Sequence, residues 1–139
     1  MTQRSPFSFG REVALPFAQT VSLVRTALQA QGFGILSEID VAAKLHEKLG
    51  VDFRPYLILG ACNPRLAHQA LGAEPELGTL LPCNVVIYAG EAENSIVTIM
   101  DPVAILGLVA RPEVAPIAHQ VRALLEAVLA ALPAGPSGA

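Results

Sequence analysis

The apolar residues of this chain follow two periods, one typical of strands and one typical of helices. Phe7, Phe9 and Val13 fall on one face of a strand, which predicts a first strand over 7–13. Apolar residues from 17 to 28 recur at helical spacing, and Gly32 ends the predicted helix. A longer helical stripe follows near the C-terminus and consists of Val114, Ile117, Ala118, Val121, Leu125, Val128 and Leu132.

Between these segments, shorter apolar runs predict the remaining elements. They are strands over 33–39, 51–62, 84–89 and 95–100, and short helices over 41–49 and 64–72. Asp40 has the residue type of an N-cap, and both Asn63-Pro64 and Asp101-Pro102 place a cap directly before a proline. A loop over 73–82 and a short turn from 101 to about 108 complete the prediction.

The order of these elements is β-α-β-α-β-α-β-β-α, which predicts an α+β fold. We expect two layers, with a mostly antiparallel five-stranded sheet packed by helices on one face. Residues 1–132 are expected to form a single domain. The small residues over 133–139 are expected to be a disordered C-terminal tail.

Composition suggests that part of the surface is covered by a partner. Apolar residues make up 53% of the 139 residues and charged residues only 15%, against about 25% in an average domain. A homodimer is the simplest way to cover such a surface. The net charge of −3 and the lack of a basic run argue against nucleic-acid binding. No segment has the length and apolarity of a signal peptide or a membrane span, so we expect a cytoplasmic protein with no membrane contact.

Cys62 and Cys83 are the two cysteines of the chain, and each is followed by an asparagine. Cys62 ends one predicted strand and Cys83 precedes the next, so an antiparallel pairing of these strands predicts that the thiols meet. Cys62 also precedes the predicted N-cap Asn63. The partial positive charge of a helix start favours a thiolate, so Cys62 is the expected nucleophile of a reactive pair.

Four interpretations of the cysteines remain open at this stage. They are inert residues of the core, a thiol redox or sulfur-handling pair, ligands of a metal, or the lining of a ligand pocket. A metal site needs further ligands, which His46, His68 or His119 could supply, and His68 could also activate a thiol as a base. No cofactor motif occurs, so neither a cofactor nor a metal is predicted. The residues leave open whether the chain is an enzyme.

Several motifs resemble the domain-of-unknown-function family 302. They are Gly32-Phe33-Gly34-Ile35-Leu36, Ile39-Asp40-Val41, Lys48-Leu49-Gly50-Val51, Gly60-Ala61-Cys62-Asn63-Pro64, and Leu81-Pro82-Cys83-Asn84-Val85-Val86 with Tyr88. The resemblance implies a compact two-layer domain with a curved antiparallel sheet and a dimeric state. It implies no activity.

The sequence therefore predicts a module that binds a small ligand or a protein partner. The binding space is expected between the sheet and the helices, beside Cys62, Asn63, Cys83, Asn84 and Tyr88. Thiol chemistry of Cys62 and Cys83 is the alternative.

Overall fold

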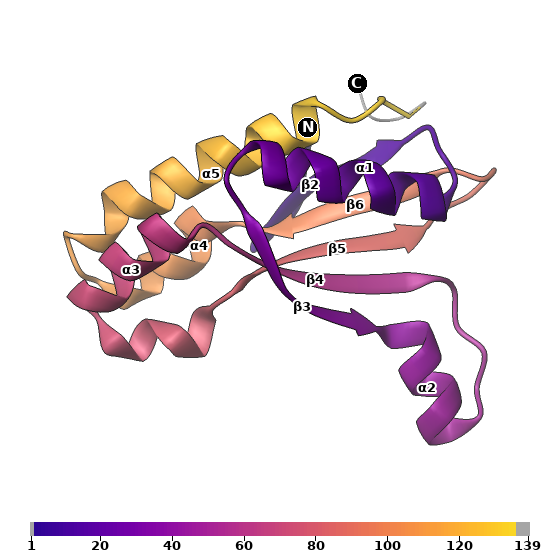
Figure 1. Cartoon of the computed structure of the whole chain (residues 1–139), viewed down its shortest axis with the longest axis horizontal. Helices are drawn as coiled ribbons and strands as arrows, with labels where there is room; N and C mark the ends of the chain where they lie inside the picture. Colours follow the sequence, from indigo (N-terminus) through magenta and orange to yellow (C-terminus); the bar gives the residue numbers. More distant parts are fainter. Residues whose placement is uncertain (1, 136–139) are drawn as a thin grey trace.

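The computed structural model describes residues 2–135 as an antiparallel sheet covered on one side by helices (Figure 1). The strands are β1 Thr2–Ser5, β2 Ser8–Val13, β3 Gly34–Asp40, β4 Tyr56–Cys62, β5 Cys83–Ala89 and β6 Ser95–Met100. The helices are α1 Phe17–Ala30, α2 Val41–Leu49, α3 Pro64–Ala73, α4 Pro102–Leu106 and α5 Val114–Ala130, with 3-10 helices η1 Pro75–Leu80 and η2 Gly107–Val109.

The α+β class and the antiparallel sheet are confirmed, but the predicted number of five strands is wrong. The sheet has six strands in the order β1-β2-β6-β5-β4-β3. The additional strand, β1, lies before the first strand that we predicted, which was expected over 7–13. It pairs with β2 through its backbone while its side chains stay largely exposed, so no apolar alternation marks it in the sequence.

Cap residues set the starts of three helices as predicted. Asp40 accepts a hydrogen bond from the backbone N–H of Ala43 at 2.9 Å, and Asn63 accepts one from Leu66 at 3.2 Å. Asp101 accepts from Val103 at 2.9 Å at the start of α4. The predicted strand over 51–62 begins only at Tyr56, because Pro55 interrupts the segment that precedes it.

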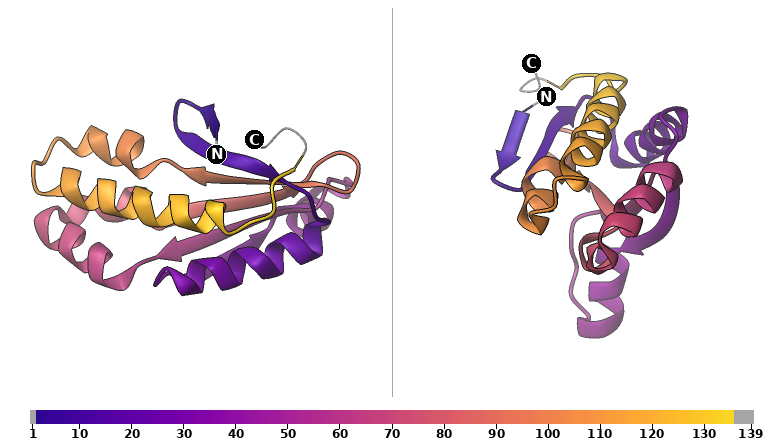
Figure 2. Two further views of the ribbon diagram at one scale, coloured as in Figure 1. Left: turned by 90° about the horizontal axis from the view of Figure 1, so that it is seen from above. Right: turned by 90° about the vertical axis from the view of Figure 1, so that its left-hand side faces the viewer.

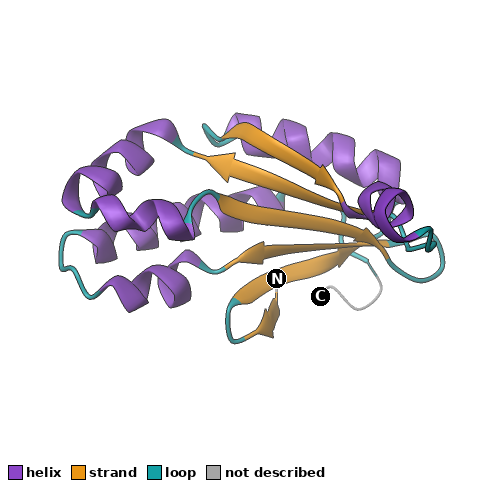
Figure 3. Ribbon diagram, turned by 90° about the horizontal axis from the view of Figure 1, so that it is seen from below, coloured by secondary structure: helices purple, strands orange, loops and turns teal. Residues whose placement is uncertain are grey.

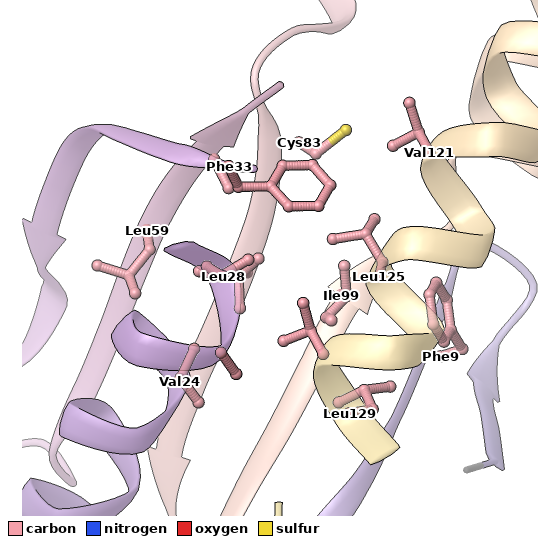
Figure 4. Packing of buried hydrophobic residues seen from close by; sticks show 14 of the residues in the cluster. Phe9, Val24, Leu28, Phe33, Leu59, Cys83, Ile99, Val121, Leu125 and Leu129 are labelled. Atoms are coloured by element: carbon pink, nitrogen blue, oxygen red, sulfur yellow. The ribbon is translucent and has the colours of Figure 1, made fainter. Parts of the chain in front are cut away.

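One face of the sheet packs against α1 and α5, which lie next to each other over it (Figure 2). The core between these layers includes Phe9, Leu28, Leu59, Val85 and Leu125, each fully buried. Figure 4 shows several of these side chains between the strands and the two helices. The apolar stripes that predicted α1 and α5 therefore face the sheet.

Helix α2 differs from the others because none of its nine residues, Val41–Leu49, is buried. It projects beyond β3 at the end of the strands opposite α3 and α4 (Figure 1). The following segment, residues 50–55, is exposed throughout. We call residues 41–55 the arm. The prediction that every helix packs on one face of the sheet does not hold for α2, whose sequence has a helical apolar stripe but whose position lies outside the core.

The C-terminal segment after α5 returns to the sheet. Ala134 forms an isolated bridge with Val13, and the N–H of Gly135 donates to the carbonyl of Glu12 at 2.9 Å. Two residues of the predicted disordered tail over 133–139 therefore contact β2, and residues 136–139 lie outside the described part of the chain. No helix within residues 2–135 has the length and apolarity needed to cross a membrane.

Candidate functional site

The turn from β4 into α3 carries Cys62 and Asn63, the first two residues of the predicted site. The Asn63 side chain caps α3 through its Oδ1, and Pro64 occupies the first turn of the helix. The amide of Asn63 also lies beside Gly32, where an added Cβ would sit 3.3 Å from Nδ2. The Asn63 side chain is therefore fixed in place by capping α3 and by its close approach to Gly32.

The two cysteines do not form the predicted pair. Cys83 lies opposite Ala61 in the β4–β5 ladder, and Cys62 is one residue further along β4, opposite Gly34 of β3. Successive residues of a strand point to opposite faces of a sheet. Cys83 belongs to the face that packs against the helices, where it lies beside Phe33 and faces Val121 (Figure 4). Both cysteines are free thiols, and the pair predicted from topology was wrong by one position in register.

The predicted activation of Cys62 is not supported either. Partial burial raises the pKa of the Cys62 thiol above its ordinary value, although the thiol precedes a helix start. Burial raises the pKa of Cys83 to about 11, with a smaller Coulombic contribution from Cys62. Desolvation disfavours the charged thiolate. Both thiols are neutral near pH 7, which is the protonation state of inert core cysteines.

A small cavity lies where we predicted a ligand, at the end of the sheet between α3 and α5. Its volume is about 30 Å³, enough for a water molecule but far below the ~300 Å³ of a small-molecule site. Its lining is almost entirely apolar and consists of Phe33, Ala61, Cys62, Asn63, Leu66, Ala67, Ala70, Leu81, Pro82, Cys83, Leu106, Ile117 and Val121. The part of the space between sheet and helices that lies beside Cys62 and Cys83 is thus filled by side chains.

Asn84 and Tyr88 lie on the other face of the sheet, away from this cavity. Asn84 pairs with Gly60 and is exposed, while Tyr88 pairs with Tyr56. The rings of Tyr56 and Tyr88 are stacked, with centroids 5.4 Å apart and planes inclined by 9°. The guanidinium of Arg54 lies over the Tyr88 ring at 5.8 Å from its centroid. The structure therefore divides the five predicted residues between two surfaces.

The second surface is the face of the sheet that α1 and α5 leave uncovered, and we call it the open face. Figure 3 looks onto it, with the strands in front of the long helices. The register assigns to it the apolar residues Ile39, Ile58, Val86 and Ile96 together with Tyr56 and Tyr88. None of these belongs to the main core cluster. The aliphatic members of the open face were not predicted from the sequence, although their alternation with the core residues of β4 and β5 was the available signal.

The histidines do not complete a metal or nucleophile site. Within residues 2–135, no cluster of three or more His, Cys, Asp or Glu side chains could hold a metal ion. His68 is not among the residues that line the cavity with the two thiols. His46 is exposed on α2.

Comparison with protein families identifies the chain. The model of the family described as "Domain of unknown function DUF302" matches residues 9–132. The chain belongs to the DUF302 family. No curated protein matches it.

A solved DUF302 structure has the same fold. It is the crystal structure of an uncharacterised conserved DUF302 protein from Bacillus stearothermophilus, which is 30% identical to this chain. The superposition has a TM-score of 0.84 and covers 92% of this chain and 99% of the other. The motifs that suggested the family from sequence therefore led to the correct assignment. The relative is itself described as uncharacterised.

Proposed function

We propose that this DUF302 chain is a protein-binding module that pairs with a second copy of itself through the open face. The observation that carries the proposal is the set of apolar and aromatic side chains on this face, Tyr56, Ile58, Val86 and Tyr88, which lie outside the core. These four side chains are half-buried and leave part of their apolar surface exposed, and contiguous apolar surface marks interaction sites. Tyrosine is moreover enriched at the centres of protein interfaces.

The arm and β3 add further exposed apolar residues beside the open face. Five of the large apolar residues that are exposed in the chain fall between positions 36 and 53, namely Leu36, Ile39, Leu49, Val51 and Phe53. They belong to β3 and to the arm, at one edge of the open face. A low charged share, 15% of the chain, is consistent with a surface that is covered in the assembled protein.

A small-molecule function at the predicted position beside the cysteines receives less support. The cavity there, at about 30 Å³, is too small for a metabolite. Thiol chemistry receives less support as well, because the pKa of each thiol is raised. Two free cysteines suit a reducing compartment, so we place the protein in the cytoplasm.

Sedimentation equilibrium across the micromolar range tests the proposal. We expect the wild-type chain to sediment as a dimer. Val86→Arg places a charge at the centre of the open face, and we expect it to weaken the dimer by about thirtyfold, or about 2 kcal/mol.

Leu108→Arg is the matched control, because Leu108 is 76% exposed on η2, at the far end of the strands from the arm. We expect this variant to remain a dimer. A monomeric wild-type chain, or a folded Val86→Arg variant that dimerises as tightly as wild type, contradicts the proposal.

A further inference from the structure

A hollow opens between α1 and the end of β3, on the face of the sheet that the helices cover. Its volume is about 430 Å³, which lies within the range of about 300–1,000 Å³ for small-molecule sites. It is lined by Phe17, Ala18, Val21, Arg25, Glu38, Asp40 and Leu57. A ligand of metabolite size therefore fits here, although it does not fit in the cavity beside the cysteines.

The floor of the hollow is apolar. Leu57 of β4 pairs with Ile87, which is fully buried in the core, so Leu57 faces the helices. Phe17 and Val21 are four positions apart in α1, and this spacing places them on one face of the helix. Phe17, Val21 and Leu57 are half-buried and pack against the core. A hydrocarbon group in the hollow leaves water and contacts these three side chains, which favours its binding.

The rim of the hollow carries three charged side chains. Glu38 and Asp40 extend from the edge strand β3, where they pair with residues of β4 that face the helices. Glu38 forms an ion pair with Arg25 of α1. Asp40 takes part in none of the ion pairs found among residues 2–135. Two carboxylates and one guanidinium leave one negative charge uncompensated.

Asp40 can bind a cation without losing its role as a helix cap. Its Oδ1 accepts a hydrogen bond from the N–H of Ala43 at 2.9 Å, at the start of α2. An ionised carboxylate accepts hydrogen bonds on both oxygens, so the second oxygen is left for a ligand. A metal ion does not suit the site, because no cluster of three or more His, Cys, Asp or Glu side chains in the described part of the chain could hold one.

We propose that the hollow binds a small organic amine, with its hydrocarbon group on the apolar floor and its ammonium group at Asp40. An apolar site with one uncompensated negative charge matches a ligand that has a hydrocarbon body and one positive charge. The same charge disfavours an anion. The hollow and the open face lie on opposite faces of the sheet, so this inference does not depend on the proposed dimer.

Titration with hexylamine and with hexanol, followed by amide chemical shifts, tests the preference for a cation. The two probes share one hydrocarbon chain, and an alkylamine is protonated at pH 7 as lysine is. We expect wild type to bind hexylamine with a dissociation constant on the order of 1 mM. The shift changes are expected at residues that line the hollow. Hexanol is expected to bind about fivefold more weakly, because it lacks the ion pair with Asp40.

This comparison requires no variant, so folding damage does not affect it. Equal affinity for the two probes, binding of neither probe, or shift changes confined to other parts of the protein overturns the proposal.

Asp40→Asn separates the charge of Asp40 from its role as a cap, because asparagine is also a good N-cap. We expect this variant to bind hexylamine about fivefold more weakly than wild type, and no more tightly than hexanol. Glu47→Gln is the matched control, since Glu47 is an exposed acid of α2 that does not line the hollow. It is expected to bind hexylamine as wild type does. If Asp40→Asn still prefers hexylamine, or if Glu47→Gln weakens binding equally, the ammonium group is not at Asp40 and the proposal is wrong.

Ala18→Phe tests the position of the hydrocarbon group, because Ala18 is an exposed residue of α1 that lines the hollow. The larger side chain occupies the space, and we expect hexylamine binding to be lost. Gln19→Phe makes the same addition at the next exposed position, which does not line the hollow, and is expected to bind as wild type does. A folded Ala18→Phe variant that binds hexylamine with wild-type affinity also overturns the proposal.

Discussion

Cys83 lies opposite Ala61 across the β4–β5 ladder, so the sulfur of Cys83 faces the helices while Cys62 belongs to the next position of β4. The two cysteines are therefore not directly opposed, and a shift of register by one residue, which would oppose them, exchanges the two faces of a strand. Buried apolar residues at Leu59 and Ala61 oppose such a shift.

Thiol reactivity follows directly from this placement. With a thiol reagent at pH 7.5, we expect Cys62 to react more slowly than a free cysteine, because burial raises its pKa. Cys83 is 5% exposed, and we expect it to react only after unfolding in urea. Cys62→Ala leaves Cys83 as the one thiol, so the reaction that this variant loses is assigned to Cys62 and the reaction that remains is assigned to Cys83. A fast reaction of Cys83 in the folded protein is the contrary result.

The raised pKa of Cys83 makes the protein less stable at high pH. A free cysteine has a pKa of about 8.5, and burial raises the pKa of Cys83 to about 11. Below the lower value both states hold a neutral thiol, and the stabilisation is fully present. As the pH rises through this window the unfolded chain ionises first, so the free energy of unfolding decreases.

Cys83→Ala removes that contribution. Urea denaturation of wild type and of Cys83→Ala at pH 7.5 and at pH 10.5 measures how much free energy of unfolding each protein loses between the two pH values. We expect wild type to lose more than Cys83→Ala over this interval, while the high-pH titration of the tyrosines cancels in the comparison. Equal losses in the two proteins are incompatible with a buried, neutral Cys83.

Arg122 stabilises the end of the sheet through a buried ion pair. Its guanidinium pairs with Asp101, which is 5% exposed and caps α4, and it lies 4.3 Å from the centroid of the Phe9 ring. We expect Arg122→Met to lower the free energy of unfolding by about 3 kcal/mol, because the carboxylate of Asp101 remains buried without its cation.

Arg111→Met is the matched control for this prediction. Arg111 pairs with Glu74 at 3.1 Å, but its side chain is 52% exposed, so we expect a loss of at most about 1 kcal/mol. Urea denaturation of both variants measures the difference. Equal losses mean that burial of Asp101 does not set the strength of the pair.

Gly60 is required on the open face because two side chains occupy the space beside it. An added Cβ would overlap the Oγ of Ser37 and lie 2.8 Å from Cγ of Pro82. We therefore expect Gly60→Ala to destabilise the fold by about 1–3 kcal/mol in thermal or urea denaturation. In the Gly60→Ala background, Ser37→Ala removes one clash and is expected to restore part of the loss.

Gly72→Ala provides the contrast. Gly72 lies in α3, and an added Cβ meets no described atom within 4 Å other than those of its two chain neighbours and of the nearby backbone of its own helix. The substitution is expected to leave stability unchanged or to raise it by up to about 1 kcal/mol, because alanine favours a helix more than glycine does. Similar destabilisation by both substitutions contradicts a steric cause at Gly60.

Local chemistry made the helices and the central strands predictable from the sequence. Asp40, Asn63 and Asp101 each supply a side-chain oxygen to the N–H groups at a helix start, and such caps act between residues only two or three positions apart. The apolar stripe from Val114 to Leu132 identified α5 because helical spacing places these residues on one face.

The elements that escaped prediction lack such a local signal. Strand β1 is held by backbone hydrogen bonds to β2, and those bonds do not depend on apolar side chains at Thr2 or Gln3. The position of the arm outside the core was equally hidden, because an amphipathic helix has the same sequence pattern whether it packs on its own sheet or on another chain.

The sequence alone determined the family, the α+β class, the main helices and most strands, since caps and periodic apolar residues act over a few positions. Tertiary structure decided the register of β4 against β5, and with it the separation of Cys62 from Cys83 and the meeting of Tyr56 with Tyr88. A displacement of one residue reverses which side chains face the helices. The packing of the whole sheet against α1 and α5 selects between the two registers, and no short segment of the chain contains that choice.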